Sequence, residues 1–386
     1  MVAARRTGRR GLAVALAAAL VATLSAGSCA PKGTAQPEQT PGDDVSYEEL
    51  PPAPNGSEDP NERQNVVPVP KGTSPRGVEF ADANTGYALF TSCVAGRACE
   101  VGLVITLDGG ASWVARKLPF DDAIDVDMHL GRGNVLVLKA SPAGYFVSRD
   151  TGNTFERRPL SPPPAELGLA DPQYSVGCED TAASGCADPQ PWVVGDDGNR
   201  QALPSRPAGT HRYTGLTAAA DGTLWLTAQA PDTTTQPGGT EISVWSSADR
   251  GRTWRAQGTA RAADPDVVVR PVVAPDGSDV WVVGARFAAR KMPGGWTEAT
   301  VMREVAEVFS AEVLPGGTLL VASGQGVFTV DMTQRTRDPA ARLIYRLRRL
   351  DATTILGYPA QQSGQVWLCT VADKRCNWAH VAVSAR

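Results

Sequence analysis

The strongest constraint on the fold of this chain is an eight-residue pattern that occurs three times. The template is Ser or Thr, any residue, Asp, any residue, Gly, any residue, Ser or Thr, and an aromatic residue. The copies span residues 106–113 (TLDGGASW), 148–155 (SRDTGNTF) and 247–254 (SADRGRTW). A fourth, degenerate copy keeps the five-residue step from Asp373 to Trp378 but has Arg375 in place of Gly. Self-similar segments of this kind are typical of architectures built from one repeated supersecondary unit.

Each position of the pattern has a role in a tight hairpin turn. The Asp carboxylate accepts hydrogen bonds from backbone N–H groups, the Gly permits a positive φ, and the hydroxyl closes the loop from the other side. The aromatic residue begins the next strand and packs into the sheet. We therefore interpret the four Asp residues as structural groups and not as catalytic carboxylates; they are Asp108, Asp150, Asp249 and Asp373.

The three complete segments resemble the Asp-box (BNR) repeat of sialidase-type β-propellers, sortilin ectodomains and photosystem II assembly-factor propellers. This resemblance implies an all-β chain folded as a β-propeller, in which each box joins the third and fourth strands of a blade. It also implies that the boxes lie at the rim, away from the ligand-binding face. No long amphipathic helix pattern competes with this interpretation.

Short β-branched or alternating runs, introduced by Gly- or Asp-containing turns, divide the rest of the chain into units. Runs predicted as second strands are 86–90, 134–138, 223–226, 280–283, 318–321 and 354–356. A weaker unit is centred on Tyr174–Cys178 and Trp192–Gly195, after three prolines at 162–164. The 315 residues from 72 to 386 then give seven four-stranded blades of about 45 residues, an ordinary repeat length for propellers. Six blades with one elaborated insertion is the alternative.

The N-terminal part of the chain is interpreted as an export signal followed by a flexible linker. Four arginines precede the apolar run 11–27, which is short for a membrane span and ends in small residues, so residues 1–28 are predicted to be a cleaved signal peptide. Cys29 directly follows, an arrangement that resembles the lipobox of bacterial lipoproteins. We expect a lipidated Cys29, a disordered linker rich in Pro and acids over 29–71, and a propeller over 72–386. The predicted location is the cell surface, with the lipid as the membrane anchor; a secreted form is the alternative.

The chain has seven cysteines, an odd number, and setting Cys29 aside leaves three close pairs. Close pairs in an exported chain are typical of local disulfides. The predicted pairs are Cys93–Cys99, Cys178–Cys186 and Cys369–Cys376. Because no Cys-x-x-Cys spacing occurs and the three histidines are scattered, we predict no metal and no cofactor.

The ligand face of a propeller is formed by the loops between second and third strands and between blades. In this chain those loops include Thr91–Glu100 and Ala230–Thr240. The connection at 119–122 leads into an alternating acidic stretch, and four carboxylates there are candidates for a ligand face; they are Asp121, Asp122, Asp125 and Asp127. A cation or a basic ligand would suit them, but solvated loop carboxylates are the alternative.

The sialidase resemblance raises the question of catalysis. Those enzymes use three arginines that bind the substrate carboxylate, a Tyr activated by a Glu, and an Asp that acts as the general acid. The weak candidates for these roles are Tyr345, Glu304, Glu307, Arg270, Arg286 and Arg346. The sequence contains no Gly-x-Ser-x-Gly elbow, no phosphate-binding Gly-rich loop and no His-Glu-x-x-His motif.

These observations favour a binding function. The formal net charge of −4 argues against a partner that is a nucleic acid. We expect a non-enzymatic, surface-tethered, monomeric propeller that binds or scaffolds a protein or glycan of the cell envelope. The alternative is a diverged exo-glycosidase of the sialidase type.

Overall fold

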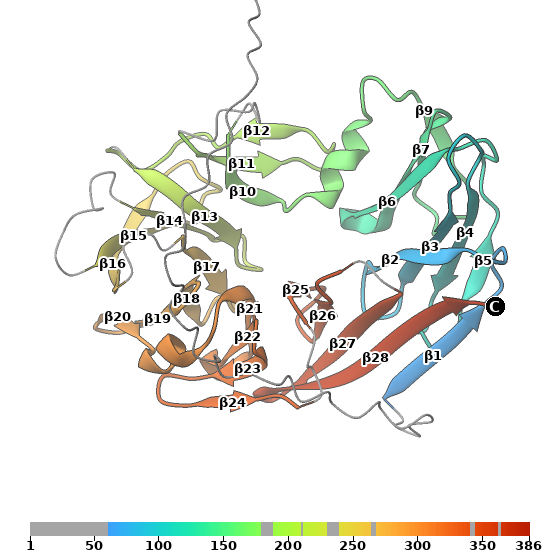
Figure 1. Ribbon diagram of the computed structural model, residues 1–386. Helices are drawn as coiled ribbons and strands as arrows, with labels where there is room; N and C mark the ends of the chain where they lie inside the picture. The colour runs from blue at the N-terminus through green and yellow to red at the C-terminus, as the bar shows by residue number, and fades with distance from the viewer. Residues whose placement is uncertain are drawn as a thin grey trace, which may run out of the picture. The chain divides into compact units, whose positions relative to one another are not determined.

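The computed structural model describes residues 61–178, 188–209, 211–229, 239–263, 268–339, 344–361 and 364–386. In these ranges the regular structure consists of β-strands with a few short 3-10 helices, and the strands form seven sheets. Figure 1 shows the sheets following one another in chain order around a central opening. The chain is therefore an all-β, seven-bladed β-propeller, which confirms the predicted fold and the higher of the two blade counts. Cys29 and the predicted signal peptide lie outside the described residues.

The strands of the first three sheets are β2 (Ser74–Phe80), β3 (Gly86–Ser92), β4 (Glu100–Thr106), β5 (Val114–Arg116); β6 (Asp125–Gly131), β7 (Val135–Ser141), β8 (Gly144–Ser148), β9 (Glu156–Arg158); and β10 (Tyr174–Gly177), β11 (Gln190–Val194), β12 (Arg200–Ala202). The fourth and fifth sheets comprise β13 (Arg212–Ala218), β14 (Leu224–Gln229), β15 (Thr240–Ser247), β16 (Arg255–Ala262); and β17 (Arg270–Val273), β18 (Val280–Gly284), β19 (Phe287–Met292), β20 (Gly295–Glu298). The sixth and seventh comprise β21 (Val308–Val313), β22 (Leu319–Ser323), β23 (Gly326–Val330), β24 (Arg335–Arg337); and β25 (Arg346–Arg349), β26 (Thr354–Tyr358), β27 (Gln365–Ala372), β28 (Arg375–Ala385) with β1 (Glu62–Val67).

The first strand of each sheet is the innermost one; β2 lies against β6, and β10, β13, β17, β21 and β25 each lie against the next around the opening. First and third strands of an antiparallel sheet run in the same direction, so the inner strands end on the side where the third strands enter the box turns. We call that side the box side, and the side where the inner strands begin the mouth side.

The ring is closed by β1, which comes from the N-terminal end of the described chain. It pairs in parallel with β28, from Glu62 opposite His380 to Val67 opposite Ala385. Two of its side chains reach into the first sheet, because Arg63 Nη1 donates to Gly109 O (2.5 Å) and Asn65 Nδ2 donates to Gly110 O (2.8 Å). The last sheet is thereby joined to the first by strands from opposite ends of the chain.

The hydrophobic core is divided into clusters that lie mainly between neighbouring sheets. Trp281 of the fifth sheet is fully buried, and its indole N–H donates to Gly317 O next to the sixth sheet (3.1 Å). The predicted second strands at 86–90, 134–138, 223–226, 280–283, 318–321 and 354–356 correspond to β3, β7, β14, β18, β22 and β26. Successive side chains of a strand point to opposite faces of its sheet, so each of these apolar strands contributes one row of side chains to the cluster on either side.

The three box turns share one set of hydrogen bonds. In the third of them, Asp249 accepts from the Thr253 N–H (2.8 Å), the Thr253 hydroxyl (2.6 Å) and the Ser247 hydroxyl (2.8 Å). Equivalent bonds surround Asp108 and Asp150. These donors lower the pKa of each of the three carboxyls to about 2, so each stays ionised and keeps its acceptor role well into the acid range.

The degenerate copy has a different geometry. Asp373 lies in the two-residue turn between β27 and β28, where Ala372 pairs with Arg375, and its φ is +52°. Arg375, which stands in place of the box Gly, belongs to β28. The shorter turn does not reproduce the loop that the three complete boxes enclose. Trp378 is linked to the preceding blade by a hydrogen bond from its indole N–H to Asp338 Oδ2 (2.8 Å).

Two of the predicted disulfides are formed, Cys93–Cys99 between β3 and β4 and Cys369–Cys376 between β27 and β28. The first fixes a mouth-side loop and the second fixes the last hairpin. The predicted Cys178–Cys186 pair includes Cys186, which lies outside the described residues.

Among the described residues, the third sheet has three strands, fewer than any other sheet. Arg132, in the β6–β7 turn on the box side, donates to Asp171 O (3.0 Å) and to Val194 O (2.9 Å). Asp171 precedes β10, so β10 begins on the box side and runs opposite to the other six inner strands. Before it, the 3-10 helix η2 (Ala165–Ala170) packs against β6 and β7. The three prolines at 162–164 lack backbone donors, which prevents this stretch from pairing as an inner strand.

Candidate binding face

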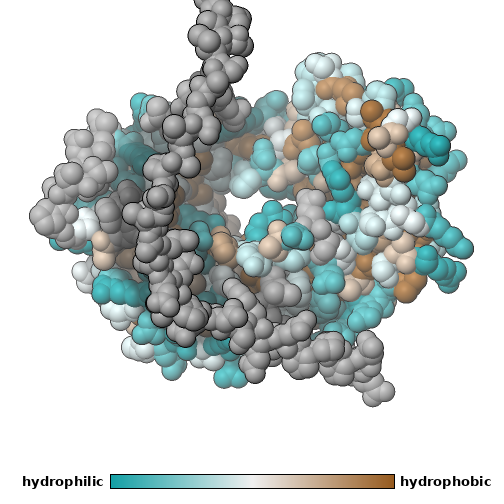
Figure 2. All heavy atoms as spheres, in the orientation of Figure 1, coloured by the Kyte–Doolittle hydropathy of each residue, from teal (hydrophilic) through white to brown (hydrophobic). Residues whose placement is uncertain are grey.

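The mouth side carries most of the exposed large apolar side chains of the described residues. Four of them lie at the start of inner strands: Ile124 before β6 (58% exposed), Val268 before β17 (62%), Phe309 in β21 (36%) and Tyr345 before β25 (36%). Figure 2 shows the central opening bordered by both hydrophilic and hydrophobic side chains. Apolar groups gathered around an opening and separated by polar ones are typical of a binding surface.

Three inner strands have a β-bulge close to the mouth. Their pairing shifts by one residue at Arg76 in β2, Thr214 in β13 and Phe309 in β21. A bulged residue is not paired with the neighbouring strand, and the bulge turns its side chain out of the regular alternation. Arg76 and Phe309 are thereby exposed at the mouth.

The exposed Phe309 forms an aromatic pair with Tyr345 of the next blade. Their ring centroids are 5.0 Å apart and the planes are inclined by 23°, which is a stacked arrangement. The backbone at Phe309 is fixed from the other side, since Arg270 Nη2 donates to Phe309 O (3.3 Å). Burial lowers the pKa of Arg270, while Glu312 opposes that shift. The pair presents a preformed apolar surface whose two halves come from different blades.

On the opposite part of the mouth, β2 and β6 are joined by ion pairs. Arg76 Nη2 lies 3.2 Å from Asp127 Oδ1 and 3.8 Å from Asp125 Oδ1. One guanidinium serves two carboxylates, and Lys139 of β7 pairs with Asp127 across the sheet. The three side chains of these ion pairs are each at least a third exposed, so a ligand can reach them. For the same reason, these ion pairs contribute little to the stability of the fold.

A second charged group joins β2 to the seventh sheet. Glu79 accepts a hydrogen bond from the Tyr358 hydroxyl (2.5 Å) and lies 3.6 Å from Arg346 Nη2 and 3.4 Å from Arg348 Nη2. The Arg346 guanidinium lies 4.0 Å above the Tyr358 ring. Burial and the charge of Glu79 raise the pKa of Tyr358 well above the usual range of a phenol. The phenol is thus a buried hydrogen-bond donor to Glu79.

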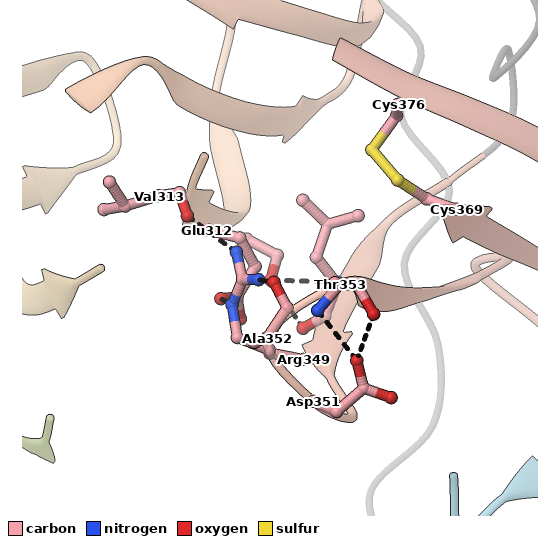
Figure 3. Close-up of polar contacts among 10 residues, drawn as sticks. Glu312, Val313, Arg349, Asp351, Ala352, Thr353, Cys369 and Cys376 are labelled. Carbon is pink, nitrogen blue, oxygen red and sulfur yellow. Dashed lines mark hydrogen bonds and ion pairs between the residues drawn. A yellow bond between two sulfur atoms is a disulfide. The ribbon is translucent and has the colours of Figure 1, made fainter. Parts of the chain in front are cut away.

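Toward the box side, the inner strands β21 and β25 are linked by a buried ion pair (Figure 3). Arg349 Nε donates to Glu312 Oε2 (3.2 Å), and Arg349 Nη2 donates to Val313 O (2.6 Å). The two side chains are 16% and 18% exposed. Burial raises the pKa of Glu312, while Arg349 and then Arg270 oppose that shift. In the turn that follows Arg349, Asp351 accepts from the N–H and the hydroxyl of Thr353.

The predicted catalytic candidates are spread over several places. Arg270, Tyr345 and Arg346 lie at or just before the start of inner strands, and Arg286 is an exposed residue of the β18–β19 turn on the same side of the ring. Glu304 ends a 3-10 helix and forms an exposed ion pair with Arg335 (3.2 Å), and Glu307 is exposed just before β21. Tyr345 contacts Phe309 and is not hydrogen-bonded to Glu304 or Glu307 in the described structure. The Tyr–Glu pair that the chain does form, Tyr358 with Glu79, was missed by the sequence reasoning.

The predicted ligand-face acids also separate into two groups. Asp125 and Asp127 lie on β6 in the ion pairs with Arg76. Asp121 and Asp122 are exposed in the preceding connection, and Asp121 borders a pocket of about 300 Å³ with Cys99, Val101, Arg116, Leu118 and Phe120. The Cys99 N–H donates to Ala123 O (2.6 Å), which ties the disulfide loop to the start of β6. The other predicted loop, Ala230–Thr240, lies outside the described residues except for its last two positions.

Within the described ranges, no three His, Cys, Asp or Glu side chains are grouped so as to hold a metal ion. In the same ranges no helix has the length and apolar character needed to cross a membrane.

Comparison with known proteins gives matches of fold. No family model matches the chain, and no curated protein sequence matches it. Among solved structures, YCF48 bound to D1 peptide is 17% identical with a TM-score of 0.43, covering 80% of this chain and 95% of its own. YCF48 from Cyanidioschyzon merolae is 13% identical with a TM-score of 0.42, covering 80% and 98%. A catalytically inactive virginiamycin B lyase from Staphylococcus aureus is 11% identical with a TM-score of 0.33, covering 81% and 86%. At such identities the similarity concerns the fold alone.

Proposed function

We propose that this chain is a non-enzymatic binding or scaffold protein that holds a protein or glycan of the cell envelope at the mouth of its propeller. The observation that carries the proposal is the exposed Phe309–Tyr345 pair beside Arg346. Aromatic and arginine side chains of this kind are enriched among residues that dominate binding energy. Across the mouth, Arg76 with Asp125 and Asp127 adds charged groups that select a partner and orient it.

The sialidase-type alternative is less well supported by this geometry. A tyrosine nucleophile has to reach the substrate and must lose its proton readily. Tyr358 is only 7% exposed and its pKa is raised, while Tyr345 is exposed but stacked on a phenylalanine. The Glu79–Tyr358–Arg346–Arg348 group is therefore better explained as the polar joint between the first and last blades.

We further propose that the three box turns are Asp-box (BNR) repeats and that the protein is exported and anchored by lipid at Cys29. Two disulfides support an oxidising compartment. Replacing Cys29 by serine removes the thiol that would be acylated after signal cleavage, so we expect the protein to move from the membrane fraction to the medium. Fractionation of cells and culture medium measures this, and a Cys29→Ser protein that stays with the membrane would contradict the anchor.

The binding proposal is tested by comparing the two sides of the ring. A photo-crosslinking amino acid at Ile124 of the full chain identifies the partner, and Leu107 on the box side, which is equally exposed, is the matched control position. We expect the double variant Phe309→Ala/Tyr345→Ala to bind the identified partner at least about 30-fold more weakly, because it loses a central aromatic anchor. Asp249→Ala should affect stability and not binding. It removes a hydrogen-bond acceptor from the box turn, so we expect a lower melting temperature and an unchanged affinity for the partner.

Equal crosslinking from Ile124 and Leu107, or full affinity in the aromatic double variant, would refute a mouth-side binding site. The same protein should not turn over fluorogenic sialosides or other aryl glycosides. Turnover that disappears in Tyr358→Phe or Tyr345→Phe would favour the glycosidase instead.

A further inference from the structure

The two described disulfides close loops of nearly the same length but differ in their surroundings. The cysteines are six residues apart in Cys93–Cys99 and seven apart in Cys369–Cys376. Cys93 is exposed and Cys99 is 7% exposed, whereas Cys369 and Cys376 are 0% and 9% exposed. A thiol that attacks a disulfide has to reach one of its sulfur atoms, so of these two pairs only the first is accessible to a reagent in the folded chain.

The buried pair belongs to the core of the last blade. It lies within the β27–β28 ladder, in which Val371 is opposite Cys376 and Cys369 is opposite Trp378. Both cysteines pack into the hydrophobic cluster between the sixth and seventh sheets. A reagent can reach their sulfur atoms only when this hairpin opens, which is a local unfolding event.

The accessible pair lies just beyond the end of a ladder. Ser92 opposite Glu100 is the last pair of β3 with β4, and Cys93 and Cys99 are the next residues of the two strands' connection. The ladder therefore keeps the two cysteines adjacent when the bond between them is broken, so the disulfide can form again. Within the loop, a turn is held by the hydrogen bond from the Arg97 N–H to Val94 O (3.0 Å).

This disulfide loop forms part of the proposed binding face. The Cys99 N–H donates to Ala123 O (2.6 Å), and Ala123 is followed by the exposed Ile124. Cys99 also lines the pocket of about 300 Å³ described above. Val94 in the loop is 61% exposed on the same side of the ring. Breaking the disulfide thus releases a loop at the mouth and leaves the core disulfide of the last blade in place.

We propose that Cys93–Cys99 is a redox switch, which a dithiol reductant opens by thiol–disulfide exchange and whose opening weakens binding at the mouth. One thiolate of the reductant attacks the exposed Cys93 Sγ, forms a mixed disulfide with it and releases Cys99 as a thiolate. The second thiol of the reductant then breaks the mixed disulfide and releases Cys93. The protein gains two electrons and two protons as two thiols, and the reductant becomes a disulfide. Arg116 and Asp121 both line the pocket beside Cys99, so access rather than charge selects the attacked sulfur.

The effect on binding follows from the conformational freedom of the loop. When the disulfide is closed, the loop is presented to a partner already ordered. When it is open, the partner has to order the loop on binding, and this ordering reduces the affinity. This part of the inference rests on the proposed binding function, whereas the selective exchange does not depend on it.

The exchange is tested on the full chain with Cys29→Ser, which removes the odd cysteine. Dithiothreitol is added for increasing times, free thiols are trapped by alkylation, and mass spectrometry assigns each labelled cysteine. We expect Cys93 and Cys99 to be labelled at least about 100-fold faster than Cys369 and Cys376, because the buried pair reacts only through local unfolding. In denaturant the two pairs should react at similar rates, which is the matched control. Equal rates in the folded chain, or faster labelling of the buried pair, would overturn the switch.

The effect on binding is tested with the partner that is crosslinked from Ile124. The selectively reduced chain should bind this partner about tenfold more weakly than the oxidised chain. Cys93→Ser/Cys99→Ser should bind as weakly as the reduced chain and should not respond to dithiothreitol, whereas Cys369→Ser/Cys376→Ser, the matched control, should keep the response. If either variant does not fold, the oxidised and reduced forms of the parent chain decide the question. An unchanged affinity of the reduced parent chain would overturn the switch.

The outcomes separate this inference from the proposed function. If the aromatic double variant weakens partner binding and reduction does not, the switch fails and the proposed function stands. If neither change affects binding, the proposed function and the switch both fail. The aromatic double variant therefore tells the two cases apart.

Discussion

A chain that begins at Pro68 should unfold at least about 10 °C below the full-length protein, because it lacks β1. The truncation exposes the site of Val67, which is 2% exposed in the intact ring, and removes the hydrogen bonds of Arg63 and Asn65 to the first box turn. One buried aliphatic side chain and two hydrogen bonds contribute about 4 kcal/mol, before the loss of the parallel ladder with β28. Calorimetry of the truncated chain measures the change in melting temperature.

The matched control begins six residues before Val67. A chain that starts at Asn61 keeps all of β1 and should melt within about 2 °C of the full-length protein, since small changes away from the core have small effects. If the two truncated chains melted at the same temperature, β1 would not be what closes the ring.

Replacing Arg349 by methionine should lower the free energy of unfolding at neutral pH by about 3 kcal/mol. The change leaves Glu312 buried without its guanidinium partner, and breaking a buried ion pair costs more than its formation contributes. Arg270 is then the remaining cation that opposes the raised pKa of Glu312, so that pKa should rise further. Chemical denaturation at pH 7 measures the loss.

The pH dependence distinguishes this cause from simple loss of side-chain contacts. A carboxyl whose pKa is higher in the folded than in the unfolded state binds its proton more tightly when folded, so it favours folding as the pH falls. The deficit of Arg349→Met should therefore shrink between pH 7 and about 5, where the box aspartates, with a pKa of about 2, remain ionised. Arg76→Met, in an exposed ion pair, is the control and should cost no more than about 1 kcal/mol. A deficit for Arg349→Met that does not change with pH would show that Glu312 is not the cause.

The blades could be predicted because their signals are local. A box turn requires its Asp, Gly and hydroxyl within eight residues, and each second strand has its own alternating run, so both can be read without knowing what lies next to them. The two close disulfides follow from the same short spacing. The repeated blades were accessible from the sequence for this reason, but β1 (Glu62–Val67) was not, because it lies in the stretch predicted to be a linker and pairs with the other end of the chain.

The candidate site could be predicted only in part, because it depends on contacts between distant parts of the chain. Tyr358 and Glu79 are 279 positions apart, and ring closure alone brings them together. The bulges at Arg76 and Phe309 depend on how two strands pair, and nothing in either strand alone marks them. The prolines at 162–164 were noted as an irregularity, but the reversed direction of β10 follows from the contacts of Arg132.

The parallel pairing of β1 also determines how the ring responds to tension. β1 runs in the same direction as β28, from the box side to the mouth side, so the chain enters the ring at the end farther from the mouth. A force pulling residue 61 away from the box side acts along the axis of β1 and loads the six paired positions of the ladder together in shear, rather than peeling them one at a time. Arg63 and Asn65 add resistance because they hold the strand to a second blade.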